Sequence, residues 1–225
     1  MTKINITTKT KQLLSDTVTP VGLYLKLRDK FQNTFLLESS DYHGNDNNFS
    51  FICLEPLASF IVEGKTITKT GLGLDTEIAI SERSQVISEL QKTIDIFNID
   101  KKDGVNGLFG YTNYDAVRYF DTLDIEAPKK EAHSTPEMHY SLFRYIIQID
   151  HFKNELLITE NIVEDAESNI QEIVELVKSN NHPQYKFNLN GTEGTNISDS
   201  DFKALVTKGK EHCQKGDVFQ LVLSR

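Results

Sequence analysis

The first 31 residues combine a polar start with an amphipathic stretch. Residues 1–18 are polar and show little periodicity, which is typical of a frayed or edge segment. Thr19-Pro20 suits the start of a helix, because Pro is favoured at the first helical position. Apolar residues at helical spacing would then share one face: Tyr24, Leu27 and Phe31. The same stretch also alternates as a strand would, so periodicity leaves both structures open; we favour the helix.

Short apolar runs separated by turn residues predict a set of strands further along. The runs occupy residues 34–38, 49–54, 58–62 and 66–69. Residues 40–48 are rich in Asp, Asn, Gly and His and therefore predict a loop. A tight turn at Glu63-Gly64 would join the last two strands.

The middle of the chain predicts a helix and a strand that carries glycines. Residues 81–97 place an apolar residue every three or four positions, which indicates an amphipathic helix. Residues 107–118, GLFGYTNYDAVR, predict a strand closely approached by another part of the chain, followed by a short helix. We expect this segment to serve the core rather than catalysis, with Asp115 and Arg118 paired at i, i+3.

A long hairpin and another helix are expected after a surface loop at 121–137. Alternating residues would share one face of the first strand, namely Phe143, Tyr145, Ile147 and Ile149. Residues 150–154 would close the hairpin. Residues 165–178 predict an amphipathic helix, and residues 179–196, rich in Asn, Gly and Thr, predict a linker.

Residues 198–225 begin with a capped helix and end with an apolar run. Ser198 offers a hydroxyl cap, followed by acids in the first turn. The buried stripe of the helix would consist of Phe202, Leu205, Val206, Gly209 and Cys213. Residues 218–224 are nearly continuously apolar, as in a strand covered on both faces. Because no evident partner strand follows, we expect an unfinished domain; the alternative is a terminal strand that returns to the first sheet.

Composition excludes several classes of function. The chain has 24 Lys plus Arg against 33 Asp plus Glu, a net charge of −9, so it lacks the basic surface that nucleic acids require. No segment approaches the ~20 apolar residues of a membrane span, and the start lacks the apolar run of a signal peptide. Cys53 and Cys213 lack metal-site spacing, and we expect both to be free, buried and unsuited to glutamine hydrolysis. These features predict a cytoplasmic protein.

Four segments in order resemble anthranilate synthase component I, the large subunit of the enzyme that makes anthranilate from chorismate. The segments are residues 19–27, Leu-Leu-Glu-Ser at 36–39, residues 107–118, and GDVFQLVLSR at 216–225, which is the most specific. The resemblance covers essentially the whole chain but less than half of a family member. It implies an α+β fold of mixed, mainly antiparallel sheets flanked by helices, in truncated form.

The resemblance also implies a domain plan and an activity. Residues 1–180 would form an N-terminal regulatory and scaffold domain, 181–197 a linker, and 198–225 the incomplete start of the chorismate-binding catalytic domain. In the complete, Mg²⁺-dependent lyase, ammonia from a glutamine amidotransferase subunit (component II) replaces the ring hydroxyl of chorismate, and pyruvate is eliminated. The catalytic residues and metal-binding glutamates would lie beyond Arg225. No residue here is therefore assigned to catalysis or to a metal, and this part alone is expected to be inactive.

An amino-acid site is expected at residues 38–39. Amino-acid recognition needs a carboxylate for the ammonium group, hydroxyl or backbone donors for the carboxylate, and an apolar slot. Glu38 and Ser39 offer the first two at a strand end, although they also suit a solvated rim. By resemblance they would hold the feedback inhibitor L-tryptophan, with Phe49 and Ser50 closing the pocket. Since the family's remaining pocket residues lie in the catalytic half, we expect weak or absent affinity here.

Two other functions stay open. Aminodeoxychorismate synthase component I shares the terminal motif and is indicated if the full-length product makes 4-amino-4-deoxychorismate. A free-standing amino-acid-binding or assembly module predicts instead that tryptophan raises the melting temperature of this chain alone. The fragment hypothesis expects almost no such shift.

Overall fold

The structure, a computed structural model, describes residues 3–39, 48–100, 104–122, 135–164, 166–179, 181, 185–192 and 194–225. Most of the loops expected at 40–48 and 121–137, parts of the expected linker, and Asp165 at the expected start of a helix lie outside these residues. The chain divides into two compact units, Met1–Pro183 and Gln184–Arg225.

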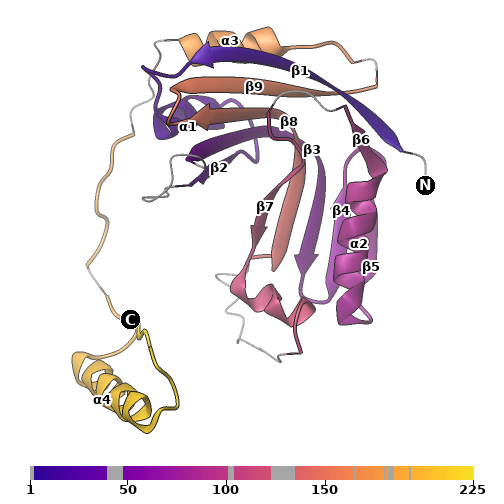
Figure 1. The fold of residues 1–225 in the computed structure, drawn as a ribbon. Coiled ribbons are helices and arrows are strands. Elements are labelled where there is room, and N and C mark those ends of the chain that lie inside the picture. The colour runs from indigo at the N-terminus through magenta and orange to yellow at the C-terminus, as the bar shows by residue number, and fades with distance from the viewer. Residues whose placement is uncertain are drawn as a thin grey trace. The chain divides into compact units, whose positions relative to one another are not determined.

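The first unit is built on one mixed sheet, and nine strands are described in it. The strands are β1 (Ile4–Leu14), β2 (Phe35–Glu38), β3 (Phe49–Glu63), β4 (Thr66–Thr70), β5 (Thr76–Ala79), β6 (Phe97–Ile99), β7 (Leu108–Thr112), β8 (Met138–Asp150) and β9 (Glu155–Val163). The order is β5-β4-β3-β8-β9-β1-β6, with β2 also paired to β3 and β7 to β8 (Figure 1). Among these pairs only β1–β6 is parallel. The expected α+β class with a mainly antiparallel sheet is therefore confirmed.

The strand β1 covers most of the polar segment at the start of the chain. It pairs with β9 from Ile6 to Leu14, whereas β6 reaches only Ile4–Ile6. Most of β1 thus lies at an edge of the described sheet, as predicted, but it is an ordered strand rather than a frayed one. Its apolar periodicity is weak because threonine supplies the inward positions, as at Thr8, which is 2% exposed.

The two long strands β3 and β8 form the centre of the sheet, and both are irregular at the same level. Their pairing shifts register between Pro56 and Ala58, and Glu55 has a φ of 58°. Tyr145, Ile147 and Ile149 share one hydrophobic cluster, as predicted. Phe143 instead belongs to a cluster with Cys53 and Ile146, so its predicted place on the same face is wrong. The regular alternation assumed for β8 fails beside this β-bulge.

Helices cover the two halves of the sheet. They are α1 (Pro20–Arg28), α2 (Arg83–Ile96), the 3₁₀ helix η1 (Tyr114–Tyr119) and α3 (Ile170–Lys178). The helix predicted at Thr19-Pro20 is confirmed, and the strand alternative is wrong: the Thr19 hydroxyl accepts a hydrogen bond from the Gly22 N–H at 3.1 Å. Leu23 and Leu27, one turn apart, are fully buried.

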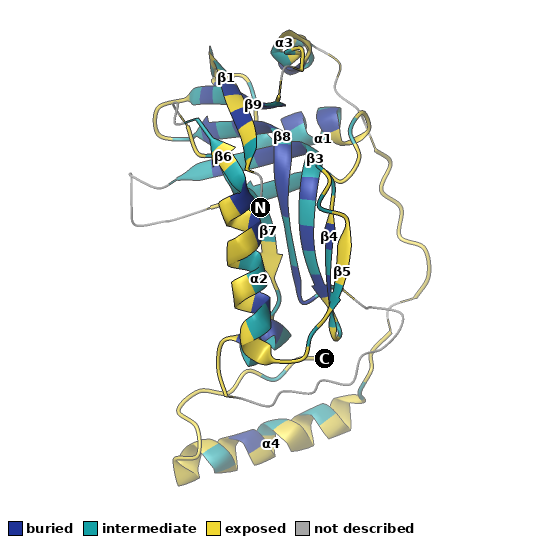
Figure 2. Ribbon diagram, turned by 90° about the vertical axis from the view of Figure 1, so that its right-hand side faces the viewer, coloured by how far each residue is buried: buried dark blue, intermediate teal, exposed yellow. Residues whose placement is uncertain are grey.

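Two main clusters fill the core. The first joins α1 and α3 to the first half of β3, the second half of β8 and β9, and includes Leu27, Ile52 and Val174. The second joins α2 and η1 to the second half of β3, to β4 and to the first half of β8, and includes Phe60, Val86 and Tyr119. Figure 2 shows the buried residues concentrated along β3 and β8, while the outer side of α2 is exposed. In the described part of the chain no helix is both long and apolar enough to cross a membrane.

The segment 107–118 adopts the predicted strand and short helix, β7 and η1. A Cβ on Gly110 would lie 1.8 Å from the carbonyl oxygen of His139 on β8, so the close approach expected of its glycines is real. The predicted Asp115–Arg118 pair is wrong. Arg118 donates instead to Glu137, 2.7 Å away and 1% exposed. The 3₁₀ helix directs the guanidinium toward the start of β8, where the Gly64 N–H also binds Glu137.

The second unit contains α4 (Asp199–Lys215), and its predicted cap is present. The Ser198 hydroxyl accepts from the Asp201 N–H, and Gly216 ends the helix with a φ of 80°. The predicted strand at 218–224 is wrong, since Phe219 is 99% exposed and Val222 80% exposed without a described strand partner. An isolated strand cannot satisfy its backbone groups, so this segment follows α4 with Leu221 against Gly209 instead.

The stripe predicted on α4 is only partly buried. Gly209 is buried, but Leu205 is exposed. Cys213 is free and exposed, so its predicted burial is wrong. Leu221 and Leu223 approach this face of α4 at Gly209 but leave Cys213 exposed. Cys53 in β3 is free and fully buried, as predicted.

Candidate functional site

The four residues expected to bind an amino acid lie on two paired strand ends. Glu38 at the end of β2 is directly opposite Ser50 near the start of β3. One step further, the Ser39 N–H donates to the Phe49 carbonyl at 3.1 Å. The antiparallel ladder thus brings together two segments that are joined through residues 40–48.

Strand alternation divides these four residues between the two faces of the sheet. Residues directly opposite each other in an antiparallel pair share a face, and neighbours along a strand do not. Glu38 and Ser50 therefore share the face of Ile52, which packs against α1 and α3. Ser39 and Phe49 share the opposite face. A ligand that contacts all four residues must sit at the ends of the strands rather than on either face.

The Glu38 face carries a polar group that the sequence did not reveal. Ser50 is 1% exposed, and its hydroxyl lies 2.7 Å from Nε2 of His151. The N–H of His151 also donates to the Asn48 carbonyl at 3.1 Å. His151 is the first residue of the β8–β9 turn, and Asp150 pairs with Phe49. The hairpin was predicted, but its pairing with β3 was not, because contacts between residues this far apart leave no local pattern.

The Phe49 face is aromatic. The ring of Phe49 lies 6.2 Å from that of Phe51, which lies 5.6 Å from the ring of Phe109 on β7. Phe109 and Phe51 pack against the buried cluster of Cys53 and Phe143. This row offers an apolar surface beside the strand ends. Burial raises the pKa of the Cys53 thiol to about 12, so this sulfur is a protonated core group and not a nucleophile.

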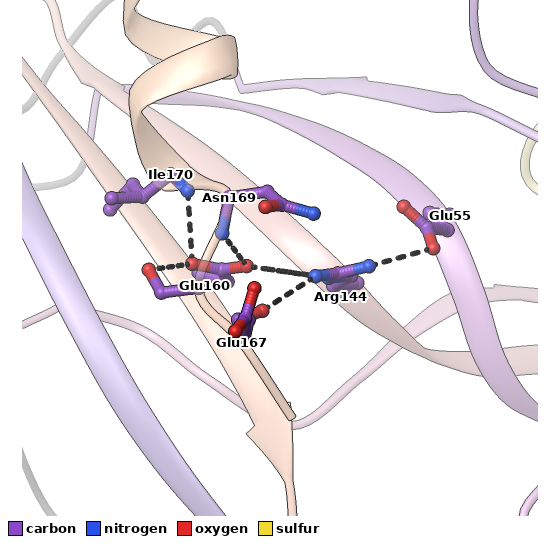
Figure 3. Close-up of polar contacts among 7 residues, drawn as sticks. Glu55, Arg144, Glu160, Glu167, Asn169 and Ile170 are labelled. Carbon is purple, nitrogen blue, oxygen red and sulfur yellow. Dashed lines mark hydrogen bonds and ion pairs between the residues drawn. The ribbon is translucent and has the colours of Figure 1, made fainter. Parts of the chain in front are cut away.

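A second polar cluster joins the bulge to the start of α3 (Figure 3). Glu160 on β9 is fully buried and accepts hydrogen bonds from the Ser168 hydroxyl and from the N–H groups of Asn169 and Ile170. Arg144 lies 3.2 Å from Glu160 and 3.3 Å from Glu55. The cluster thus satisfies the first backbone donors of α3 and fixes the bulged part of β3, which is a structural role.

The charge of Glu160 is maintained by these contacts. Burial alone would raise its pKa, but the hydrogen bonds from Asn169 and Ser168 and the charge of Arg144 outweigh burial and hold the pKa below its usual value. Glu160 is therefore ionised at neutral pH.

One cavity of about 450 Å³ lies between α2 and the sheet. It is lined mainly by apolar side chains, including Ile94, Leu108 and Leu142. Its polar residues are already engaged: Asn106 exchanges hydrogen bonds with Asn161, and the Tyr140 hydroxyl lies 2.7 Å from that of Thr112. The cavity contains none of the four expected site residues.

The described residues include no group of three or more His, Cys, Asp or Glu side chains that could hold a metal ion.

Comparison with known proteins identifies the family. The sequence pattern of the chorismate binding enzymes matches residues 32–225, and the chain belongs to this family. Anthranilate synthase component 1 of Lactococcus lactis is 28% identical over 232 residues, covering 96% of this chain and 48% of the relative. The Saccharomyces cerevisiae protein of the same name is 29% identical, covering 92% and 43%. The expected resemblance to anthranilate synthase component I is thus confirmed.

The fold comparison agrees. The crystal structure of anthranilate synthase component I from Streptococcus pneumoniae superimposes with a TM-score of 0.52 at 17% identity, covering 92% of this chain and 46% of that one. At this identity the likeness supports the fold alone. The chain spans about half the length of the curated relatives it matches.

Proposed function

We propose that this chain is the N-terminal, regulatory and scaffold part of an anthranilate synthase. The observation that carries the proposal is similarity to component 1 proteins along nearly the whole chain, within the chorismate binding enzyme family. The complete protein would convert chorismate to anthranilate and pyruvate, with ammonia delivered by a glutamine amidotransferase partner. The 225 residues would supply the sheet on which the catalytic half is assembled.

Product analysis of the complete protein tests this proposal. With chorismate, ammonium and Mg²⁺ we expect anthranilate fluorescence, whereas the 225 residues alone should form none. Formation of 4-amino-4-deoxychorismate by the complete protein would instead establish aminodeoxychorismate synthase activity. Anthranilate formed by the 225 residues alone would contradict the proposed division of labour.

We further propose that the ends of β2 and β3 bind L-tryptophan as a feedback inhibitor. Glu38 is exposed and provides a carboxylate for the ammonium group. At the strand ends, Phe49 on the opposite face begins an aromatic row that provides the apolar surface an indole ring requires. With pocket residues outside this chain missing, we propose a dissociation constant of about 1 mM or weaker for the 225 residues, so the melting temperature should shift very little.

Replacing Glu38 with glutamine should weaken L-tryptophan binding by about tenfold, because the ammonium group loses its charged acceptor. NMR titration of the 225-residue chain measures such weak binding directly. Glu77→Gln is the matched control, since Glu77 is also an exposed strand glutamate but lies on β5. If Glu38→Gln and Glu77→Gln bind L-tryptophan with equal affinity, Glu38 does not contact the ligand.

A further inference from the structure

We propose that His151 is a ligand-binding residue of this amino-acid site and that its imidazole binds the carboxylate of the amino acid whose ammonium group Glu38 holds. The inference rests on the proposed tryptophan site and adds to it a residue from the β8–β9 turn. It also changes the role of Ser50 from a ligand contact to a support for the histidine.

The first argument is accessibility. Ser50 is 1% exposed, so a ligand cannot reach its hydroxyl without displacing the surrounding chain. His151 is only partly buried, and its Nε2 lies 2.7 Å from the Ser50 hydroxyl. The polar group that this face offers to a ligand is therefore the imidazole. In the tautomer that this role requires, the Ser50 hydroxyl donates to Nε2, and Nδ1 carries the ring proton and is available as a donor.

The second argument is position. Side chains directly opposite each other on antiparallel strands have Cβ atoms about 4.5–5.5 Å apart, and Glu38 and Ser50 are such a pair. The hydrogen bond between the Ser50 hydroxyl and Nε2 places the imidazole next to this pair. The ammonium and carboxylate groups of an α-amino acid are separated by a single carbon. One ligand can therefore bridge Glu38 and His151 through two hydrogen bonds of about 2.8 Å each.

The third argument is rigidity. The backbone of His151 is held by its bond to the Asn48 carbonyl. The turn that follows is ordered by Asp150, whose carboxylate accepts from the N–H groups of Phe152 and Lys153, each at 3.0 Å. A side chain fixed at both its backbone and its ring loses little conformational freedom when a ligand binds.

A comparison of two ligands tests the proposal. L-Tryptophanamide keeps the ammonium group and the indole ring of L-tryptophan but lacks the carboxylate. For the unmodified chain, NMR titration should show about tenfold weaker binding of the amide than of L-tryptophan. In His151→Phe this ratio should fall to about one, because neither ligand then has a donor for its carboxyl end. His151→Gln, which retains an N–H donor, should restore part of the ratio.

Several outcomes overturn the proposal, and they differ in what they leave standing. If His151→Phe weakens both ligands equally, the residue is merely structural, and the tryptophan site survives without it. If neither the unmodified chain nor the complete protein binds L-tryptophan, the proposed tryptophan site and this inference both fail. His212→Gln in the second unit is the matched control and should leave the ratio unchanged. The circular dichroism spectrum of His151→Phe must match that of the unmodified chain, which shows that the variant is folded. If it does not match, the ligand ratio is read from His151→Gln instead.

Discussion

Replacing Glu160 with alanine should lower the free energy of unfolding by about 3–5 kcal/mol. The substitution leaves Arg144 without its buried partner and removes the acceptor for the first backbone donors of α3. Unfolding in urea, followed by circular dichroism, measures the loss. Glu175→Gln is the control, because Glu175 lies on the exposed side of α3 and should change stability by less than about 0.5 kcal/mol. A loss below about 1 kcal/mol for Glu160→Ala would show that the cluster is not a structural centre.

The same cluster predicts a pH dependence. The pKa of Glu160 is lower in the folded chain than in the unfolded one, so its contribution is complete above the unfolded value of about 4.3. It is lost as the pH falls from there through the lower folded pKa. Glu160→Gln lacks this titration. The stability difference between the unmodified chain and Glu160→Gln should therefore be constant from about pH 7 to 5 and shrink below about pH 4.

Replacing Gly110 with alanine should destabilise the first unit by about 3 kcal/mol. The new Cβ would lie 1.8 Å from the carbonyl oxygen of His139, and a strand backbone cannot move aside as a flexible side chain does. The strand β7 must then separate from β8. Urea unfolding measures the loss, and hydrogen exchange should show faster exchange of the amides of β7. Gly194→Ala is the control, since no described atom outside its chain neighbours lies within 4 Å of the position that its added methyl group would occupy. Unchanged exchange in β7 would contradict the close approach.

Features set by neighbouring residues could be predicted from the sequence. Thr19 and Ser198 cap helices through bonds to residues three positions away, and the β8–β9 hairpin closes over a short turn. The two strands that carry Glu38 and Ser50 were predicted from local apolar runs, whereas the closeness of these residues was expected only from the family resemblance. The caps, the hairpin and the strands are local features, so periodicity and turn residues indicate them directly.

The features that were missed depend on distant pairing. Ser50 meets His151 across 101 positions, and no pattern near either residue indicates the contact. The β-bulge between Pro56 and Ala58 broke the alternation expected for Phe143. One local signal was available but unused: Glu160 is the charged residue of a short polar run, Thr159 to Asn161, between apolar residues of β9, and a charge in such a position needs partners.

The strand order also determines when this sheet can assemble during synthesis. Because β1 pairs with β9, Ile6 cannot form its strand pairing until Val163 has left the ribosome. At ordinary elongation rates this delay is on the order of ten seconds. Throughout this time the backbone of β1 is open to other chains. The strand is rich in threonine and lysine, which is why its sequence shows little apolar periodicity. The same composition disfavours aggregation during that interval. The polarity of the first strand thus protects the nascent protein until its partner strand is made.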